Sequence, residues 1–226
     1  RTHNHEMTAV YTLQIADGTG ASATSQVDLN INGRGNLRYL SPLSFDERHR
    51  LSANIDYRYG SGIQYNGPRW FGADVFSEAG ISLQANAASG RPYTKEQRPD
   101  RFGSSGVGGA INGARLPWNF SLDMRIDKSF RIAGKENGKP LFMNVYLRVE
   151  NLLDQRNVVG VYAASGSAYD DGYLVTPNGQ SSIQTLIDSG REEDVDNYLI
   201  SYQWGELVPG FFTLPRRVYL GAVLQF

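Results

Sequence analysis

Six stretches of this chain alternate apolar and polar residues with a period of two. The clearest ends the chain, where Val218, Leu220, Ala222, Leu224 and Phe226 all fall on one face. Strict period two predicts an extended strand with a single apolar face. Strands of soluble proteins average about 5 to 6 residues, whereas a strand tilted across a bilayer needs about 9 to 11. Since the alternation persists for this longer distance, it favours a membrane β-sheet.

The other five stretches repeat this design over residues 8–15, 51–59, 81–87, 118–127 and 141–150. These stretches show almost no periodicity of the kind typical of an α-helix. In the first stretch Val10 interrupts the polar face. The smallest bacterial single-chain barrels have about eight strands, so six strands are too few to close a barrel. The unpaired edges of an open sheet cannot be exposed to lipid. We therefore expect all-β architecture in which these strands belong to a larger antiparallel barrel.

Charged residues occupy the second face in the middle of several strands. They include Asp123, Arg125 and Asp127 in one strand, and Arg148 and Glu150 in the next. In a membrane barrel this face lines a wet lumen, while the apolar face meets lipid. These five residues are predicted to face the lumen and to hold a plug through ion pairs. The alternative is a hydrated face whose charges pair across strands.

Composition excludes several classes of protein. The net charge of -1 gives no reason to expect a nucleic-acid partner. There is no cysteine and no run of about 18 apolar residues, so neither a thiolate metal site nor a membrane-spanning helix is expected. Neither the G-x-S-x-G nor the H-E-x-x-H motif occurs, and no enzymatic activity or cofactor is predicted.

The connections predict the orientation in the membrane. Residues 132–140 form a short link, whereas 16–50, 92–117 and 154–215 are long and rich in small polar residues. Outer-membrane barrels have short periplasmic turns and long extracellular loops. The C-terminus is therefore expected in the periplasm and the long links outside the cell. The link 60–78 is longer than this pattern expects for a periplasmic turn.

The longest link, 154–215, is expected to contact a ligand or a partner through Asp170, Asp171 and Tyr173. These aspartates and the acidic residues of 192–196 suggest calcium ligands, but they lack the spacing of a calcium loop. A hydrated external loop is the favoured interpretation, and no metal site is predicted. Tyr57, Tyr59 and Trp118 are candidates for the aromatic girdles at the two membrane interfaces.

Several segments resemble the C-terminal barrel region of TonB-dependent outer-membrane receptors. Residues 144–157 resemble the penultimate strand of that family and the opening of its last outer loop, and 216–226 are similar to its final strand. The segment 46–59 resembles the entry into an earlier strand of that family, and the segment 89–94 resembles the exit from the next strand. Residues 160–162 and 170–174 resemble the Oar-like receptors that carry a carboxypeptidase-regulatory-like domain.

This resemblance implies that residues 1–226 are the last six or so strands of a roughly 22-stranded barrel, with its plug and N-terminal strands outside this sequence. It implies substrate import driven by the TonB complex. The implied partners are outer-membrane lipid, the rest of the barrel and its plug, and a surface lipoprotein. Phe226, with Leu224, Ala222, Leu220 and Val218 on its face, resembles the signal read by the barrel-assembly machinery.

Three alternatives stay open at this point. The first is a passive or secretion-type outer-membrane barrel, which needs no plug. The second is a receptor-like barrel used as a structural scaffold in a larger complex. The third is a soluble β-sandwich that binds carbohydrate or protein, and it requires the apolar faces of these strands to meet in a common core.

Overall fold

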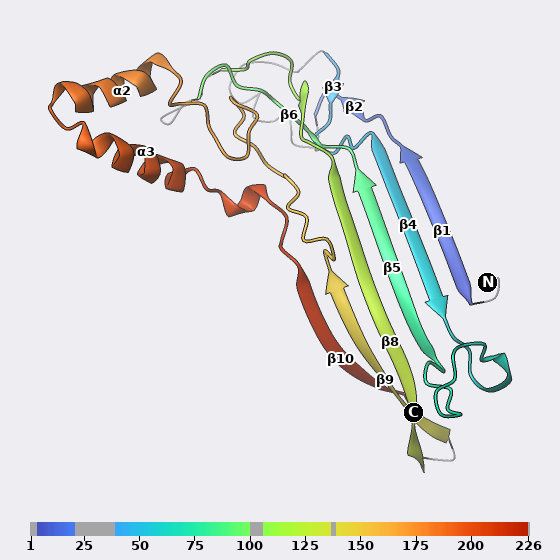
Figure 1. Cartoon of the computed structure of the whole chain (residues 1–226). Coiled ribbons are helices and arrows are strands. Elements are labelled where there is room, and N and C mark those ends of the chain that lie inside the picture. Colours follow the sequence, from blue (N-terminus) through green and yellow to red (C-terminus); the bar gives the residue numbers. More distant parts are fainter. Residues whose placement is uncertain (1–3, 21–38, 100–105, 137–138, 226) are drawn as a thin grey trace.

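A computed structural model describes residues 4–20, 39–99, 106–136 and 139–225. Its main feature is a six-stranded antiparallel sheet in the order β1-β4-β5-β8-β9-β10 (Figure 1). The strands are β1 (His5–Leu13), β4 (His49–Arg58), β5 (Ala79–Ala88), β8 (Asn119–Glu136), β9 (Lys139–Glu150) and β10 (Arg217–Gln225). The predicted all-β, antiparallel character is confirmed.

The register places most apolar residues beside the apolar residues of neighbouring strands. One apolar row runs from β4 to β10 through Tyr57, Ile81, Ile126, Leu147 and Leu220, and His5 of β1 pairs with Tyr57 at its end. A one-residue slip would turn every apolar side chain to the opposite face, so this pairing preserves one apolar and one polar face throughout.

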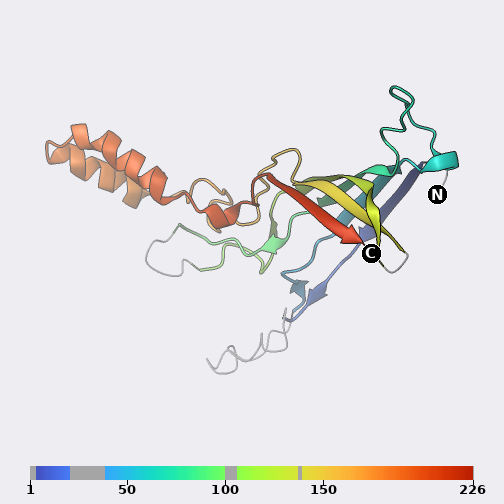
Figure 2. The same ribbon diagram turned by 90° about the horizontal axis from the view of Figure 1, so that it is seen from below.

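The sheet is a single layer with no partner layer among the described residues (Figures 1 and 2). Leu220 on its apolar face is 78% exposed, and Leu13, Ile55, Val218 and Leu224 are exposed as well. The common core that a β-sandwich requires is therefore missing from the part of the chain that the structure describes. Within that part β1 and β10 form open edges, and the sheet does not close on itself.

The predicted short link 132–140 is wrong in its bounds. β8 continues to Glu136 and β9 begins at Lys139. Both strands of this hairpin are longer than the strands beside them, β5 and β10. β5 pairs with β8 as far as Lys128, and within the described residues β10 pairs with β9 as far as Phe142. The far part of the hairpin therefore extends past the other strands.

Two helices correct the expectation that 154–215 is an irregular loop. They are α2 (Pro177–Asp188) and α3 (Glu193–Gly205), followed by the 3-10 turn η2 (Pro209–Phe211). They lie side by side beyond the β10 edge of the sheet (Figures 1 and 2). Among the described residues, neither these nor any other helix is both long and apolar enough to cross a membrane.

Short elements organise the remaining connections. β2 (Asp17–Gly18) pairs with β3 (Ser41–Pro42), and β6 (Pro92–Tyr93) pairs with β7 (Ala114–Arg115). Both pairs lie at the same end of the sheet as α2 and α3 (Figure 1). The 3-10 turn η1 (Gly62–Gln64) lies in the β4–β5 connection at the opposite end.

Candidate functional site

Asp127 is the centre of a hydrogen-bonded network on the polar face of the sheet. Its carboxylate is buried and accepts two hydrogen bonds from the Arg58 guanidinium, at 2.7 and 3.1 Å, and one from the Asn144 amide, at 2.9 Å. These three residues come from β8, β4 and β9. To reach Asp127, Arg58 crosses β5 at Gly80, where a Cβ atom would lie 2.7 Å from the guanidinium. The network therefore depends on a strand position without a side chain.

A second group of charges joins the last strands. Arg148 pairs with Glu150 at 2.9 Å, and Glu150 also pairs with Arg217 on β10 at 2.6 Å. Asp123 accepts a hydrogen bond from the backbone N–H of Asn151 at 2.8 Å, just after β9 ends. The Glu150 carboxylate, shared between Arg148 and Arg217, connects β9 to β10 through charge-assisted contacts. The predicted lumen-facing residues thus lie on one face and are largely paired with one another or with backbone.

Arg125 completes this face by stacking. Its guanidinium carbon lies 4.4 Å from the centre of the Tyr146 ring, within cation–π range. The Tyr146 ring in turn lies over Gly221 on β10, where an added Cβ atom would be 2.5 Å from the ring. An aromatic ring over a strand glycine covers backbone that would otherwise be bare.

The apolar face carries an aromatic cluster at each end. At the end nearer α2 and α3, His49 stacks on Trp118, with ring centres 5.9 Å apart, and Trp118 lies 6.2 Å from Phe120. At the other end Tyr57 and Tyr59 meet edge to face at 5.2 Å. The three predicted girdle residues are therefore divided between opposite ends of the strands, with aliphatic side chains between the clusters.

The distance between the clusters follows from β4, which begins at His49 and includes Tyr57. Eight residues at about 3.3 Å each give about 26 Å along the strand. A tilt of about 40° reduces this to about 20 Å along the axis of a barrel, near the apolar band of about 25 Å on outer-membrane barrels.

Asp46 joins two connections at the α2–α3 end of the sheet, the β1–β4 connection that contains it and the β5–β8 connection that contains Arg115. Its side chain is fully buried, pairs with Arg115 of β7, and accepts a hydrogen bond from the Ala16 N–H at 3.0 Å. Arg115 also donates to the backbone carbonyl of Asp46 at 2.7 Å. Burial acts to raise the pKa of Asp46, but the hydrogen bonds from Arg115 and Ala16 outweigh it and lower the pKa below its usual value.

Two residues of the predicted ligand loop lie beside a buried glutamate. Asp171 donates its N–H to a Glu206 carboxylate oxygen at 3.2 Å, and Tyr202 donates its hydroxyl to the Asp171 carboxylate at 2.6 Å. Tyr173 stacks on Tyr202, with ring centres 5.9 Å apart. Burial, followed by the hydrogen bond with the Asp171 side chain, raises the pKa of Glu206 to about 7. The cluster fastens α3 to the loop before α2.

Asp170, Asp171 and Glu206 each offer a carboxylate oxygen, and the three oxygens lie within 4.8 Å of one another. Calcium takes six to eight oxygen ligands, and this cluster supplies three carboxylates, each of which already accepts a hydrogen bond from the protein. The acidic residues of 192–196 lie instead at the start of α3, where negative charge complements the helix dipole.

Several residues of these networks were missed from the sequence, among them the central acceptors Asp46 and Glu206 and the donor Asn144. These residues find their partners through strand register and loop packing, which no local motif encodes. On β10, Val218, Leu220, Ala222 and Leu224 share one face as predicted, but Phe226 lies outside the described residues. Its assembly role stays a prediction.

Comparisons with protein-family models, with curated proteins and with solved structures found no match. The chemistry of this sheet is therefore interpreted from its own residues.

Proposed function

We propose that this chain forms part of the wall of an outer-membrane β-barrel that receives a substrate and imports it with energy from the TonB complex. The observation that carries the proposal is the two-sided sheet. One face is exposed, apolar and bounded by aromatic clusters, and the other carries cross-strand charge networks. Water on one side and lipid on the other is the environment that satisfies both faces.

In this arrangement the α2–α3 end of the sheet faces the cell exterior and the C-terminus faces the periplasm. The networks around Asp127 and Glu150 line the lumen, where charged groups can contact a plug. The connection 154–215 offers its surface to the substrate or to a surface lipoprotein. Import rather than passive passage rests on the resemblance of residues 144–157 and 216–226 to TonB-dependent receptors.

Alternate cysteine substitutions along β10 test the barrel. Leu220→Cys and Ala222→Cys on the apolar face should resist a water-soluble maleimide in native membranes, whereas Tyr219→Cys and Val223→Cys on the polar face should react. The matched pairs differ by one position in the same strand. Reaction of all four sites alike would contradict a wall between lipid and water.

Uptake tests the transport role separately. Cells with and without the full-length gene are given defined mixtures of labelled peptides, oligosaccharides and metal chelates. Accumulation that requires both the gene and an intact proton-motive force supports TonB-coupled import. Accumulation that requires the gene but survives a protonophore indicates a passive channel instead.

A further inference from the structure

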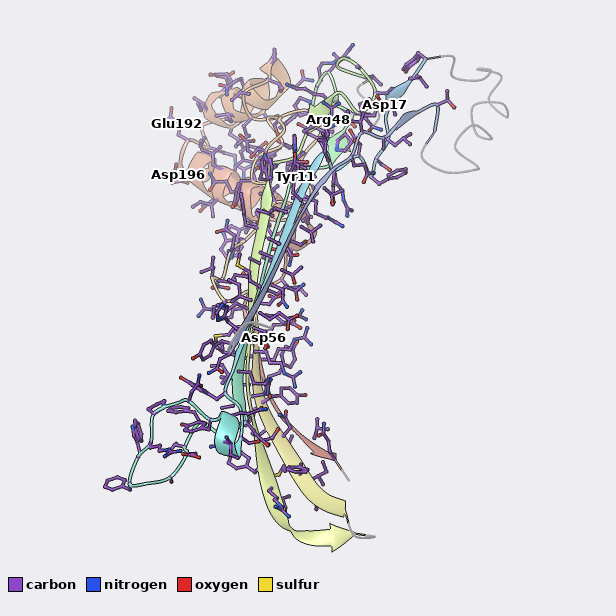
Figure 3. All side chains as sticks on the ribbon, turned by 90° about the vertical axis from the view of Figure 1, so that its right-hand side faces the viewer. Tyr11, Asp17, Arg48, Asp56, Glu192 and Asp196 are labelled. Carbon is purple, nitrogen blue, oxygen red and sulfur yellow. The ribbon has the colours of Figure 1, made fainter. Side chains whose placement is uncertain are left out.

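The β4–β5 connection, residues 60–78, folds back over the apolar face of the sheet. Tyr65 is buried there, 5.8 Å from the Tyr59 ring, and Phe76 lies 6.0 Å from the same ring. The Tyr65 hydroxyl donates to the Pro68 carbonyl at 2.6 Å, which fixes the loop internally. In Figure 3 this connection stands out to one side of the sheet at its lower end.

The tip of this connection exposes large apolar side chains. Ile63 and Phe71 are as accessible as in an extended peptide, at 105% and 109%, and Trp70 is 59% exposed. Phe71 also has a left-handed backbone, with φ of 51°. Such a conformation is unfavourable for a bulky residue and persists where the surrounding structure imposes it. The loop therefore presents its most apolar residues outward.

Charge on the connection is low and internally compensated. Arg69 pairs with Asp74 at 2.8 Å, and Glu78 is the only other charged residue between 60 and 78. A surface that binds a charged protein partner would be expected to carry unpaired charge. Tryptophan, tyrosine and phenylalanine are instead the residues that concentrate at membrane–water interfaces.

An apolar groove of about 200 Å³ lies between this connection and the sheet. Tyr57, Tyr59 and Phe76 line it together with Ala79, Ile81 and Ile126. The last two belong to the row of apolar residues that crosses the sheet to Leu220. The groove is thus continuous with the face assigned to lipid in the proposed function.

We propose that residues 60–78 insert into the periplasmic leaflet at its headgroup boundary, with Ile63, Trp70 and Phe71 in the lipid, and that the groove holds one acyl chain of a phospholipid. This inference rests on the proposed barrel. It explains why the connection is longer than a periplasmic turn needs to be. A membrane-associated loop of this kind fixes the height of the strands in the bilayer.

Depth-dependent quenching tests the insertion in the full-length protein, reconstituted in phosphatidylethanolamine–phosphatidylglycerol nanodiscs. A bimane label is placed on Phe71→Cys, Leu220→Cys or Ser181→Cys, since these 226 residues contain no other cysteine. Label 71 should be quenched by shallow nitroxide lipids and be several-fold less quenched by iodide than label 181 on α2. Label 220 reports on the barrel itself.

The outcomes separate the two ideas. Quenching of label 220 by lipid, with label 71 open to iodide, overturns the insertion and leaves the barrel intact. If label 220 is not quenched by lipid, the barrel proposal itself fails. Protection of label 71 from both iodide and lipid quenchers indicates a protein partner and also overturns the insertion.

Occupancy of the groove is tested by native mass spectrometry of retained phospholipid. Ala79→Phe fills the groove, and Ala87→Phe adds the same ring on the same face of β5 at its other end. The first variant should lose retained phospholipid and the second should keep it, with both showing the folded, heat-modifiable gel mobility of the parent. Equal retention by both folded variants would rule out an acyl-chain site here.

Discussion

Replacement of Asp46 by asparagine should loosen the β1–β4 and β5–β8 connections without disturbing the strands. The substitution keeps the shape of the side chain but leaves Arg115 without its counterion, and the single remaining side-chain oxygen can accept from the Ala16 N–H or from Arg115 but not take both former places. Removing one partner of a buried ion pair costs about 3 to 5 kcal/mol. Because the Arg115 side chain is 28% exposed, water can hydrate part of the remaining charge, and we expect about 2 to 3 kcal/mol.

Hydrogen exchange reports this loss where it occurs. A change of about 2 to 3 kcal/mol corresponds to about 30- to 140-fold faster exchange, since 1.4 kcal/mol is a factor of ten. The amides of Ala16 and Leu43 should show it, because the first donates to the Asp46 carboxylate and the second to the Ala16 carbonyl at 2.8 Å. Amides in the middle of β5 and β8 should not change.

Asp74→Asn is the matched control, because it breaks an ion pair whose partner, Arg69, is largely exposed. An exposed pair contributes at most about 1 kcal/mol, or about fivefold in exchange. If Asp46→Asn accelerates exchange of Ala16 and Leu43 by no more than this, the carboxylate does not hold the connections together and the reasoning is refuted.

Three further perturbations test the networks described above. The folded-state pKa of Glu206, about 7, lies above its ordinary value of 4.5, so the stability that protonated Glu206 contributes is full below about pH 4.5 and is lost as pH rises through 7. Hydrogen exchange of the preceding helix α3, corrected for intrinsic rates, should therefore accelerate between these pH values. Glu206→Gln should abolish this pH dependence. Gly221→Ala places a Cβ 2.5 Å from the Tyr146 ring and should destabilise the sheet by about 1 to 3 kcal/mol in a thermal assay of heat-modifiable mobility, with Tyr146→Ala in the same chain restoring part of the loss. Arg58→Met removes the bidentate partner of the buried Asp127, leaving it with Arg125 at 4.0 Å, and should cost about 3 kcal/mol in that assay; a change under about 1 kcal/mol would mean that water or Arg125 replaces the pair.

The sequence predicts the strands of this sheet well because one physical rule governs them all. Each strand must present apolar side chains to one side and polar ones to the other, and that period is visible in residues 217–225 and 141–150 without knowledge of any partner. The side-chain pairs between distant strands cannot be read from this period. Arg58 and Asp127 are 69 positions apart, and their contact depends on Gly80 in the strand between them.

The helices were missed although their starts carry local signals. Thr176 caps α2 by accepting a hydrogen bond from the Gly179 N–H, Pro177 follows at the first helical position, and acidic residues fill the first turn of α3. The apolar periodicity of α3 is weak, and α2 and α3 pack chiefly on each other rather than on a core. A narrow apolar stripe in a long polar link is hard to distinguish from a loop.

The α2–α3 hairpin behaves as an appendage. Its ties to the body of the protein run mainly through Tyr202, Asp171 and Glu206 at its base, and the turn between the helices contains Gly190, at a backbone φ of 71° with open space around it. Surface segments with free tips tolerate insertion without harm to the scaffold. In the orientation proposed above, short peptides or fluorescent tags grafted at Gly190 would be carried on the extracellular side and would label the protein without disturbing the sheet.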